Sequence, residues 1–264
     1  MPAELPGYQS FDFTHEGTTK KVYWTGDAAH PPIVLMHELP GLIQQCIDLG
    51  QRLAAEGYAV FMPLLFGEPN PSPLDFPKYY AQVCIRNEFN MLATRKSSPI
   101  TEWLRGLCRE AKRRCHDQGC GVIGMCLTGG FALTLMADDS VLAPVLSQPS
   151  LPLGLTKAQK CDLGVTPDIL ERSVERSRTD NIPVLAMRFT GDKLCPPERF
   201  DEMQRRFGDR FRRIDLDSSI GNPHGHPIWS HSVLTVHYDP TPGSPTRQAY
   251  DAVLTFFGQE LKHI

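Results

Sequence analysis

The sequence has no excess of charge of either sign and no long hydrophobic run. Its 264 residues include 27 Lys or Arg and 30 Asp or Glu, which gives a formal net charge of −3. This near balance argues against attachment to nucleic acid or to an anionic membrane through bulk charge. The longest nearly apolar stretch, residues 58–66, is interrupted by a proline, and a membrane-spanning helix needs about 20 residues. We therefore expect no nucleic-acid partner and no membrane span.

Several other signals are missing. The N-terminus has no basic patch followed by an apolar segment, so no secretory signal is expected and a cytoplasmic location follows by default. Eight cysteines are present, but no two form a Cys-x-x-Cys pair, which argues against a redox-sensing thiol protein. In a reducing cytosol most of them should be buried free thiols. Because no dinucleotide fingerprint occurs, no organic cofactor is predicted.

Short apolar runs alternate with longer segments of helical spacing, which predicts an α/β fold with a mostly parallel central sheet and helices on both faces. Without repeats or linkers, residues 1–264 are expected to form a single domain with a small insertion near 149–181. The predicted strands are 9–14, 20–24, 33–36, 58–62, 121–125, 141–146, 183–189 and 211–216. The predicted helices are 46–56, 77–92, 100–116, 128–137, 167–178, 197–207 and 246–261.

The glycine-rich segment 121–131 places a nucleophilic side chain at the end of a buried strand. In it, Gly124 precedes Cys126 by two residues, and an apolar helix is expected to follow. This pattern is typical of the nucleophile elbow, a sharp strand-to-helix turn that lifts a Ser or Cys above a sheet. The usual motif has glycine two residues after the nucleophile, where this chain has Thr128. A structural cysteine beside a glycine-rich turn explains the segment alone equally well.

Two backbone amides are suited to stabilise an oxyanion beside Cys126. The Leu127 amide follows the nucleophile directly, and a helix N-terminus places partial positive charge nearby. The loop after the predicted strand 33–36 supplies the second donor in α/β-hydrolases, here the amide of Leu39. The same loop carries Glu38, a carboxylate expected at the sheet edge that also holds Cys126.

An acid and a group of histidines follow Cys126 in the order typical of this fold. Asp192 follows the predicted strand 183–189 and should lie at the carboxyl edge of the sheet, where catalytic groups gather. Three histidines crowd the next long loop, and a fourth follows it. His231 is the predicted base and His226 is the alternative, whereas the other two, His224 and His237, are expected on the surface.

Neither the histidine-rich loop nor the pair His37-Glu38 predicts a metal site. The crowded loop has no nearby acid or cysteine at a familiar ligand spacing. The pair His37-Glu38 is similar to the start of a zinc-protease helix, but Gly41 stands where that motif requires a second histidine. No metal is therefore expected.

Taken together, these segments resemble the dienelactone hydrolase family of α/β-hydrolases. The likeness covers nearly the whole chain and is carried, in order, by Glu38-Leu39-x-Gly41, Gly124-x-Cys126-Leu127-x-Gly129, Gly191-Asp192 and His231-Ser232. It implies a triad of Cys126, Asp192 and His231. It also implies that Glu38 interacts with the cysteine in the resting enzyme and is displaced when substrate binds.

The same resemblance implies hydrolysis of unsaturated lactones or small carboxylic esters through an acyl-cysteine intermediate, without a cofactor. Family members bind a substrate carboxylate with arginines, and Arg86 is a candidate by its position. The chain departs from the family at Thr128, in the insertion and in the proline-rich histidine loop, so the shape of the pocket is not predicted.

A catalytically inactive small-molecule binding protein with the same fold is the alternative function. The presence of all three triad residue types in order favours the enzyme. The expected partner is a small ester or lactone substrate, and a monomer is the simplest expectation for the oligomeric state.

Overall fold

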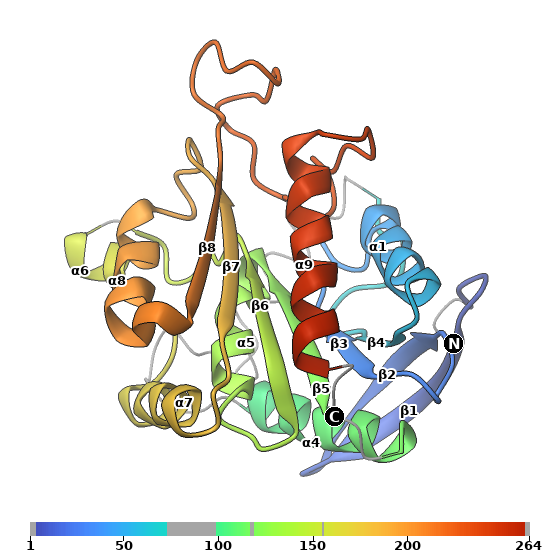
Figure 1. Ribbon diagram of the computed structural model, residues 1–264. Helices are drawn as coiled ribbons and strands as arrows, with labels where there is room; N and C mark the ends of the chain where they lie inside the picture. The colour runs from blue at the N-terminus through green and yellow to red at the C-terminus, as the bar shows by residue number, and fades with distance from the viewer. Residues whose placement is uncertain (1–3, 73–98, 117–118, 155, 262–264) are drawn as a thin grey trace.

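The computed structural model describes residues 4–72, 99–116, 119–154 and 156–261. One sheet of eight strands runs through the molecule in the order β1-β2-β4-β3-β5-β6-β7-β8 (Figure 1). The strands from β4 to β8 pair in parallel, while β2 is antiparallel to both of its neighbours. In chain order the strands are β1 Gln9–His15, β2 Thr18–Thr25, β3 Pro32–Leu35, β4 Ala59–Pro63, β5 Cys120–Met125, β6 Val141–Ser147, β7 Val184–Phe189 and β8 Phe211–Leu216.

Helices cover both faces of this sheet, which confirms the predicted α/β-hydrolase architecture. The α-helices are α1 Gln44–Ala55, α4 Pro99–Arg114, α5 Gly129–Leu135, α6 Lys157–Cys161, α7 Pro167–Thr179, α8 Pro197–Phe207 and α9 Pro245–Leu261. Two short 3-10 helices, η3 Cys126–Thr128 and η4 Gly208–Arg210, complete the set. The predicted helix 77–92, and Arg86 with it, lies outside the described residues.

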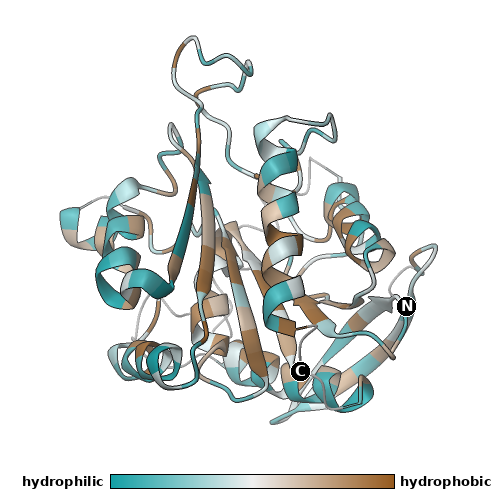
Figure 2. Ribbon diagram, in the orientation of Figure 1, coloured by the Kyte–Doolittle hydropathy of each residue, from teal (hydrophilic) through white to brown (hydrophobic). Residues whose placement is uncertain are grey.

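The sheet separates two hydrophobic cores because neighbouring side chains of a strand point to opposite faces. Val34 and Met36 join the core beneath α4, α5, α7 and α8, whereas Ile33 and Leu35 join the core beneath α1 and α9. Hydrophobic residues accordingly concentrate in the strands, and the outer faces of the helices are hydrophilic (Figure 2). No helix in the described part of the chain is long and apolar enough to span a bilayer.

The carboxyl ends of β3, β5, β6 and β7 meet at one edge of the sheet, where the predicted site residues follow these strands. A long connection without helix or strand, residues 217–244, links β8 to α9 and projects beyond this edge (Figure 1, orange to red). It carries His231. Short backbone turns, such as those closed by Ser230 N to Pro227 O and His237 N to Ser232 O, and side-chain contacts order this segment.

The segment 149–181 contains α6 and α7, of which the sequence analysis missed α6. Arg199 of α8 is 1% exposed and holds this segment in place through hydrogen bonds. Its guanidinium donates to the carbonyl oxygens of Pro149 at 2.6 Å, Pro152 at 2.5 Å and Asp162 at 2.8 Å. The division into one domain with an insertion stays a prediction.

Candidate active site

Cys126 lies at a sharp turn between a buried strand and a helix. β5 is buried along its whole length, and Cys126 directly after it has a backbone φ of 50°, which non-glycine residues rarely adopt. The turn requires Gly124, because a Cβ atom there would lie 2.3 Å from the carbonyl oxygen of Thr128. Conformation and glycine position both match the nucleophile elbow.

Thr128, the departure from the usual motif, is part of how the turn is held. Its side chain is fully buried, and its hydroxyl accepts a hydrogen bond from the Met125 amide at 2.9 Å. The same oxygen lies 3.3 Å from the Met36 carbonyl oxygen and 3.4 Å from that of His37. A glycine would lack these contacts, so the hydroxyl joins the elbow to the loop that follows β3.

Asp192 and His231 form a close pair beside Cys126. His231 Nδ1 lies 2.6 Å from Asp192 Oδ2, and the aspartate is 5% exposed. Asp192 Oδ1 accepts from the Leu194 amide at 2.9 Å, which fixes the carboxylate in its turn. Since Asp192 occupies Nδ1, the other ring nitrogen is left to face the cysteine.

The surroundings of His231 favour its protonated form. Burial by itself lowers the pKa of His231, but hydrogen bonds with Asp192 and Cys126 and the charges of both groups outweigh it and raise this pKa to about 10. A histidine held in this way between a carboxylate and a thiol is suited to form an imidazolium beside a thiolate.

Glu38 joins three segments that are distant in the sequence. Its side chain is 2% exposed, and Oε2 accepts from the Ser232 hydroxyl at 2.8 Å and from the Gln148 amide at 3.2 Å. Its other oxygen accepts from the Thr235 hydroxyl. The carboxylate therefore anchors the turn that carries His231, and its displacement by substrate would break all of these bonds.

His37, next to Glu38, acts as a neutral support. Burial lowers the pKa of His37 to about 4. Its Nε2 accepts from the Leu65 amide at 3.0 Å, and Nδ1 lies 3.1 Å from the Glu38 carbonyl oxygen. This arrangement orders the loop in which the Leu39 amide lies.

The two predicted oxyanion donors come from the elbow and from the loop after β3. Leu127 belongs to η3, and Leu39 follows Glu38 in that loop. The contact between the Thr128 hydroxyl and the His37 carbonyl oxygen brings the two segments together. The role of the two amides as oxyanion donors stays a prediction.

The remaining histidines of the long loop make other contacts. The ring of His226 packs against Phe189, with centroids 5.0 Å apart, and His224 lies beside it. His237, expected on the surface, is half-buried, and its Nδ1 accepts from the amides of Ser232 at 3.2 Å and His231 at 3.4 Å. Among these four, His231 is the one paired with Asp192.

The other described cysteines, with the exception of Cys161, are more deeply buried than Cys126. Burial raises the pKa of the Cys46 and Cys195 thiols and brings that of Cys115 to about 12. The Cys108 pKa is raised by a hydrogen bond with Cys120 and by burial. Among the described cysteines, only Cys126 and Cys161 are half-buried. All described cysteines are free thiols.

A cavity of about 430 Å³ lies next to the elbow. Leu127 and Phe131 line it from one side, and Leu151, Leu163 and Val165 of the insertion line it from the other. Cys126 is not among its lining residues, so the cavity adjoins the cluster without containing the sulfur. Its volume falls in the range of small-molecule sites.

Sequence reasoning did not select several polar residues of this edge. Gln148 follows β6 with a φ of 37°, and its Oε1 accepts from the Val233 amide at 3.3 Å. Ser150 donates to the Gln148 carbonyl at 2.8 Å, and its hydroxyl lies 3.5 Å from His231 Nε2. The sequence offered one signal for these residues: Ser147 and Gln148 are polar and directly follow the predicted buried strand 141–146.

Comparison with known sequences identifies a family that covers most of the chain. Residues 21–261 match the sequence profile described as "Dienelactone hydrolase family". No curated protein sequence matches the chain.

Solved structures share the fold at low sequence identity. The dienelactone hydrolase from Anabaena variabilis has a TM-score of 0.59 and 14% identity, with 97% of this chain and 99% of that chain covered. Esterase 2 of Thermogutta terrifontis has a TM-score of 0.60 and 15% identity, with 98% and 97% covered. A cold-adapted esterase from an Arctic intertidal metagenomic library has a TM-score of 0.59 and 10% identity, with 98% and 97% covered.

At such identities the structures carry the fold alone, and the match along residues 21–261 carries the family. The chain belongs to the dienelactone hydrolase family and is a carboxylic ester hydrolase of that type.

Proposed function

We propose that the protein is a cysteine-dependent hydrolase that opens lactones or cleaves small carboxylic esters through an acyl-cysteine intermediate. The observation that carries this proposal is the contact of 2.6 Å between Asp192 and His231 beside a cysteine on a nucleophile elbow. The three residues of the proposed triad come from separate segments, and the contact between His231 and Asp192 supports their joint action.

In the proposed reaction, the Cys126 thiolate attacks the ester carbonyl carbon, and the amides of Leu39 and Leu127 bind the resulting oxyanion. Each amide is expected to lower the barrier by about 3 to 4 kcal/mol. His231, oriented by Asp192, gives its proton to the leaving alkoxide and then takes one from the water that hydrolyses the thioester. The thiol is regenerated, and the products are an alcohol and a carboxylic acid.

Glu38 is the proposed resting-state carboxylate beside Cys126. Its oxygens already accept from Ser232, Thr235 and Gln148, so we assign it a second task, which is to hold the His231 turn in place. The cavity beside Leu127 supports a small substrate with an apolar part. Arg86 remains a candidate to bind a substrate carboxylate. A cytoplasmic location and a monomeric state belong to the same proposal.

The test compares Cys126→Ala with Cys115→Ala on an activated aryl ester and on an acidic unsaturated lactone. Cys115 is the control, because this free thiol follows α4 and does not line the cavity beside Leu127. We expect Cys126→Ala to lower kcat/KM by at least about 1,000-fold without a change in melting temperature, and Cys115→Ala to leave the activity per folded molecule unchanged.

Mass spectrometry of the quenched reaction should find the acyl group on the peptide that contains Cys126. Hydrolysis by Cys126→Ala at the wild-type rate would refute the assignment of the nucleophile. A wild-type protein that binds these compounds without turnover would support the alternative, an inactive binding protein with the same fold.

A further inference from the structure

Three potential metal ligands meet at the elbow. One ligand atom each from Glu38, Cys126 and His231 lies within 4.8 Å of the other two. Thiolate sulfur, imidazole nitrogen and carboxylate oxygen are the donor types that Zn²⁺ takes in proteins. They come from the loop after β3, the start of η3 and the connection between β8 and α9. The three ligands come from distant segments, so they match no familiar metal-ligand spacing in the sequence.

His231 and Glu38 are already oriented by hydrogen bonds of the kind that hold ligands in metal sites. His231 Nδ1 is bonded to Asp192 at 2.6 Å, which leaves Nε2 for a metal. A carboxylate behind a ligating histidine is the usual arrangement in zinc sites. Glu38 is oriented by the hydroxyls of Ser232 and Thr235, and a carboxylate retains further lone pairs after accepting these bonds.

The geometry requires a small contraction. Tetrahedral zinc, with bonds of about 2.0 to 2.3 Å, holds its donor atoms about 3.3 to 3.6 Å apart. The three donor atoms lie within 4.8 Å of one another, so each pair must approach by no more than about 1.5 Å. Cys126 and His231 are half-buried, so both can adjust and the metal has a path from solvent. Three protein ligands leave the fourth position for water.

We propose that Cys126, His231 and Glu38 bind one divalent cation of the zinc class, and that the bound cation blocks the hydrolase reversibly. On binding, sulfur and Nε2 form bonds to the metal, and the one proton that these two atoms share in the resting pair is released to solvent, without any change of oxidation state. The cation inhibits and takes no part in hydrolysis, because it occupies the electron pairs that attack and proton transfer need. The inhibitory half rests on the proposed function, whereas the binding half does not.

Binding is tested on the metal-free full-length chain by competition for Zn²⁺ with a chromophoric chelator. We expect one zinc per chain with a dissociation constant in the micromolar range or tighter. Cys126→Ala should abolish this binding, Glu38→Gln should weaken it at least 10-fold, and the control Cys161→Ala should not change it. Substitution by Co²⁺ should produce a thiolate-to-metal charge-transfer band that Cys126→Ala lacks.

The absence of 1:1 binding would overturn the site, as would equal affinity in wild type and Cys126→Ala. Equal affinity in wild type and Glu38→Gln would remove the carboxylate from it. Hydrolysis is then measured with and without zinc. Activity that persists at saturating zinc would overturn the inhibitory half. Failure of the proposed function is a separate outcome, because it shows as undiminished hydrolysis by Cys126→Ala in excess chelator.

Discussion

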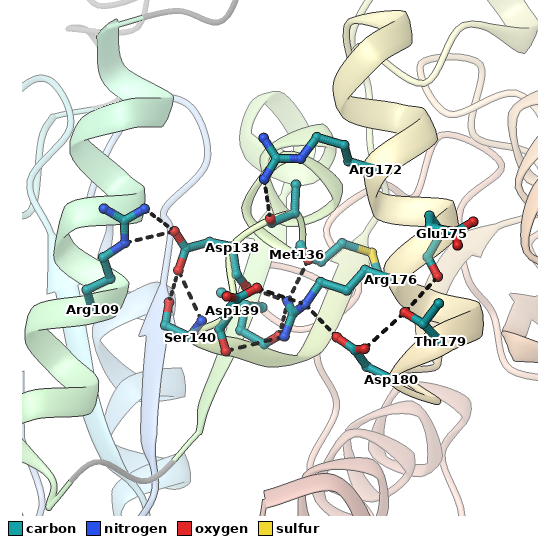
Figure 3. A network of polar contacts seen from close by, with 12 residues as sticks. Arg109, Met136, Asp138, Asp139, Ser140, Arg172, Glu175, Arg176, Thr179 and Asp180 are labelled. Carbon is teal, nitrogen blue, oxygen red and sulfur yellow. Dashed lines mark hydrogen bonds and ion pairs between the residues drawn. The ribbon is translucent and has the colours of Figure 1, made fainter.

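Two polar clusters lie at opposite edges of the sheet and differ in how completely their groups are paired. At the carboxyl edge, Cys126 and His231 are half-buried. At the amino edge, residues 136–140 lead from α5 into β6 and bind arginines from α4 and α7 (Figure 3).

Arg176 of α7 is the centre of the amino-edge cluster. It donates to the carbonyl oxygens of Met136 at 2.7 Å and Val141 at 2.8 Å and to that of Asp138, and it pairs with Asp180 at 3.0 Å. Figure 3 shows these contacts converging on its guanidinium. Each of the three guanidinium nitrogens of Arg176 has a partner that the fold itself supplies, so this side chain stabilises the amino edge.

A pair of equally buried aspartates sharpens the contrast. Asp138 is 7% exposed and binds Arg109 and Ser140, whereas Asp192 is 5% exposed and binds His231. An aspartate with a permanent cation is structural, but one with a titratable imidazole controls where a proton resides. The partner of each aspartate, rather than its burial, therefore determines its role. The variants below test this difference between the two edges.

The largest effect is expected from Asp192→Asn. The amide would donate to His231 and favour the wrong tautomer, so kcat/KM should fall about 10³ to 10⁴-fold, while the melting temperature changes little. Steady-state hydrolysis of an activated ester measures this. Asp138→Asn is the matched control and should keep kcat/KM within about twofold. An equal loss of activity in both variants would erase the distinction between the edges.

Next in size is Arg176→Met, which tests the amino edge alone. The variant leaves buried carbonyl oxygens without a donor, so the free energy of unfolding should fall by about 3 to 5 kcal/mol. Urea denaturation measures this loss, and activity per folded molecule should stay unchanged. Arg178 is exposed on the same helix, and Arg178→Met should change the free energy by no more than about 0.5 kcal/mol. Similar losses for both arginines would contradict the assignment.

A smaller loss of stability is expected at Glu38, for which we propose two roles: a carboxylate beside Cys126 and an anchor of the turn that carries His231. Glu38→Ala removes the acceptor of the Ser232 and Thr235 hydroxyls, which should cost about 2 kcal/mol of stability and speed hydrogen exchange in residues 230–237. Glu38→Gln keeps an acceptor and should protect this turn nearly as well as the wild type. If both variants expose the turn equally, its anchoring depends on the charge instead of the hydrogen bonds.

The smallest effect is a pH dependence at Asp138. Burial by itself raises the pKa of this carboxyl, but the hydrogen bonds from Arg109 and Ser140 hold it below its usual range. A lowered folded-state pKa stabilises the fold above the unfolded-state value and loses this contribution as the pH falls through the folded-state value. The stability difference between wild type and Asp138→Asn should therefore shrink below about pH 4.

The pH effect should be on the order of 1 kcal/mol, because the Arg109 side chain is 61% exposed and solvent weakens the pair. Urea denaturation at several pH values measures the difference. A difference that grows on acidification would have the wrong sign and would contradict the assignment.

Much of the fold was predictable because a buried strand is recognised from a short run of apolar residues. β5 is a buried run without charge, and its predicted bounds agree with the structure to within one residue. The helix predicted at 128–137 is shorter, since the elbow occupies Cys126–Thr128 as a 3-10 turn and α5 begins at Gly129. α6 has five residues and no buried ones, so it carries no apolar period to detect.

The contacts of the site were less predictable. The Thr128 hydroxyl approaches carbonyl oxygens more than 90 residues earlier in the chain, and Thr235 binds Glu38 across 197 residues. Such pairs leave no local periodicity. Likewise, His226 and His231 stand in the same loop, and only the position of Asp192 distinguishes them.

The sequence by itself determined the order of strands and helices, the elbow at Gly124-x-Cys126 and the edge at which acid, histidine and carboxylate would meet, because these depend on hydrophobic periodicity and on backbone sterics within a few residues. Only the tertiary structure decided which histidine meets Asp192, why a threonine suits the elbow, and that Glu38 anchors the histidine turn. Those outcomes depend on side chains from distant segments, whose hydrogen bonds form only once the sheet has brought its carboxyl ends together.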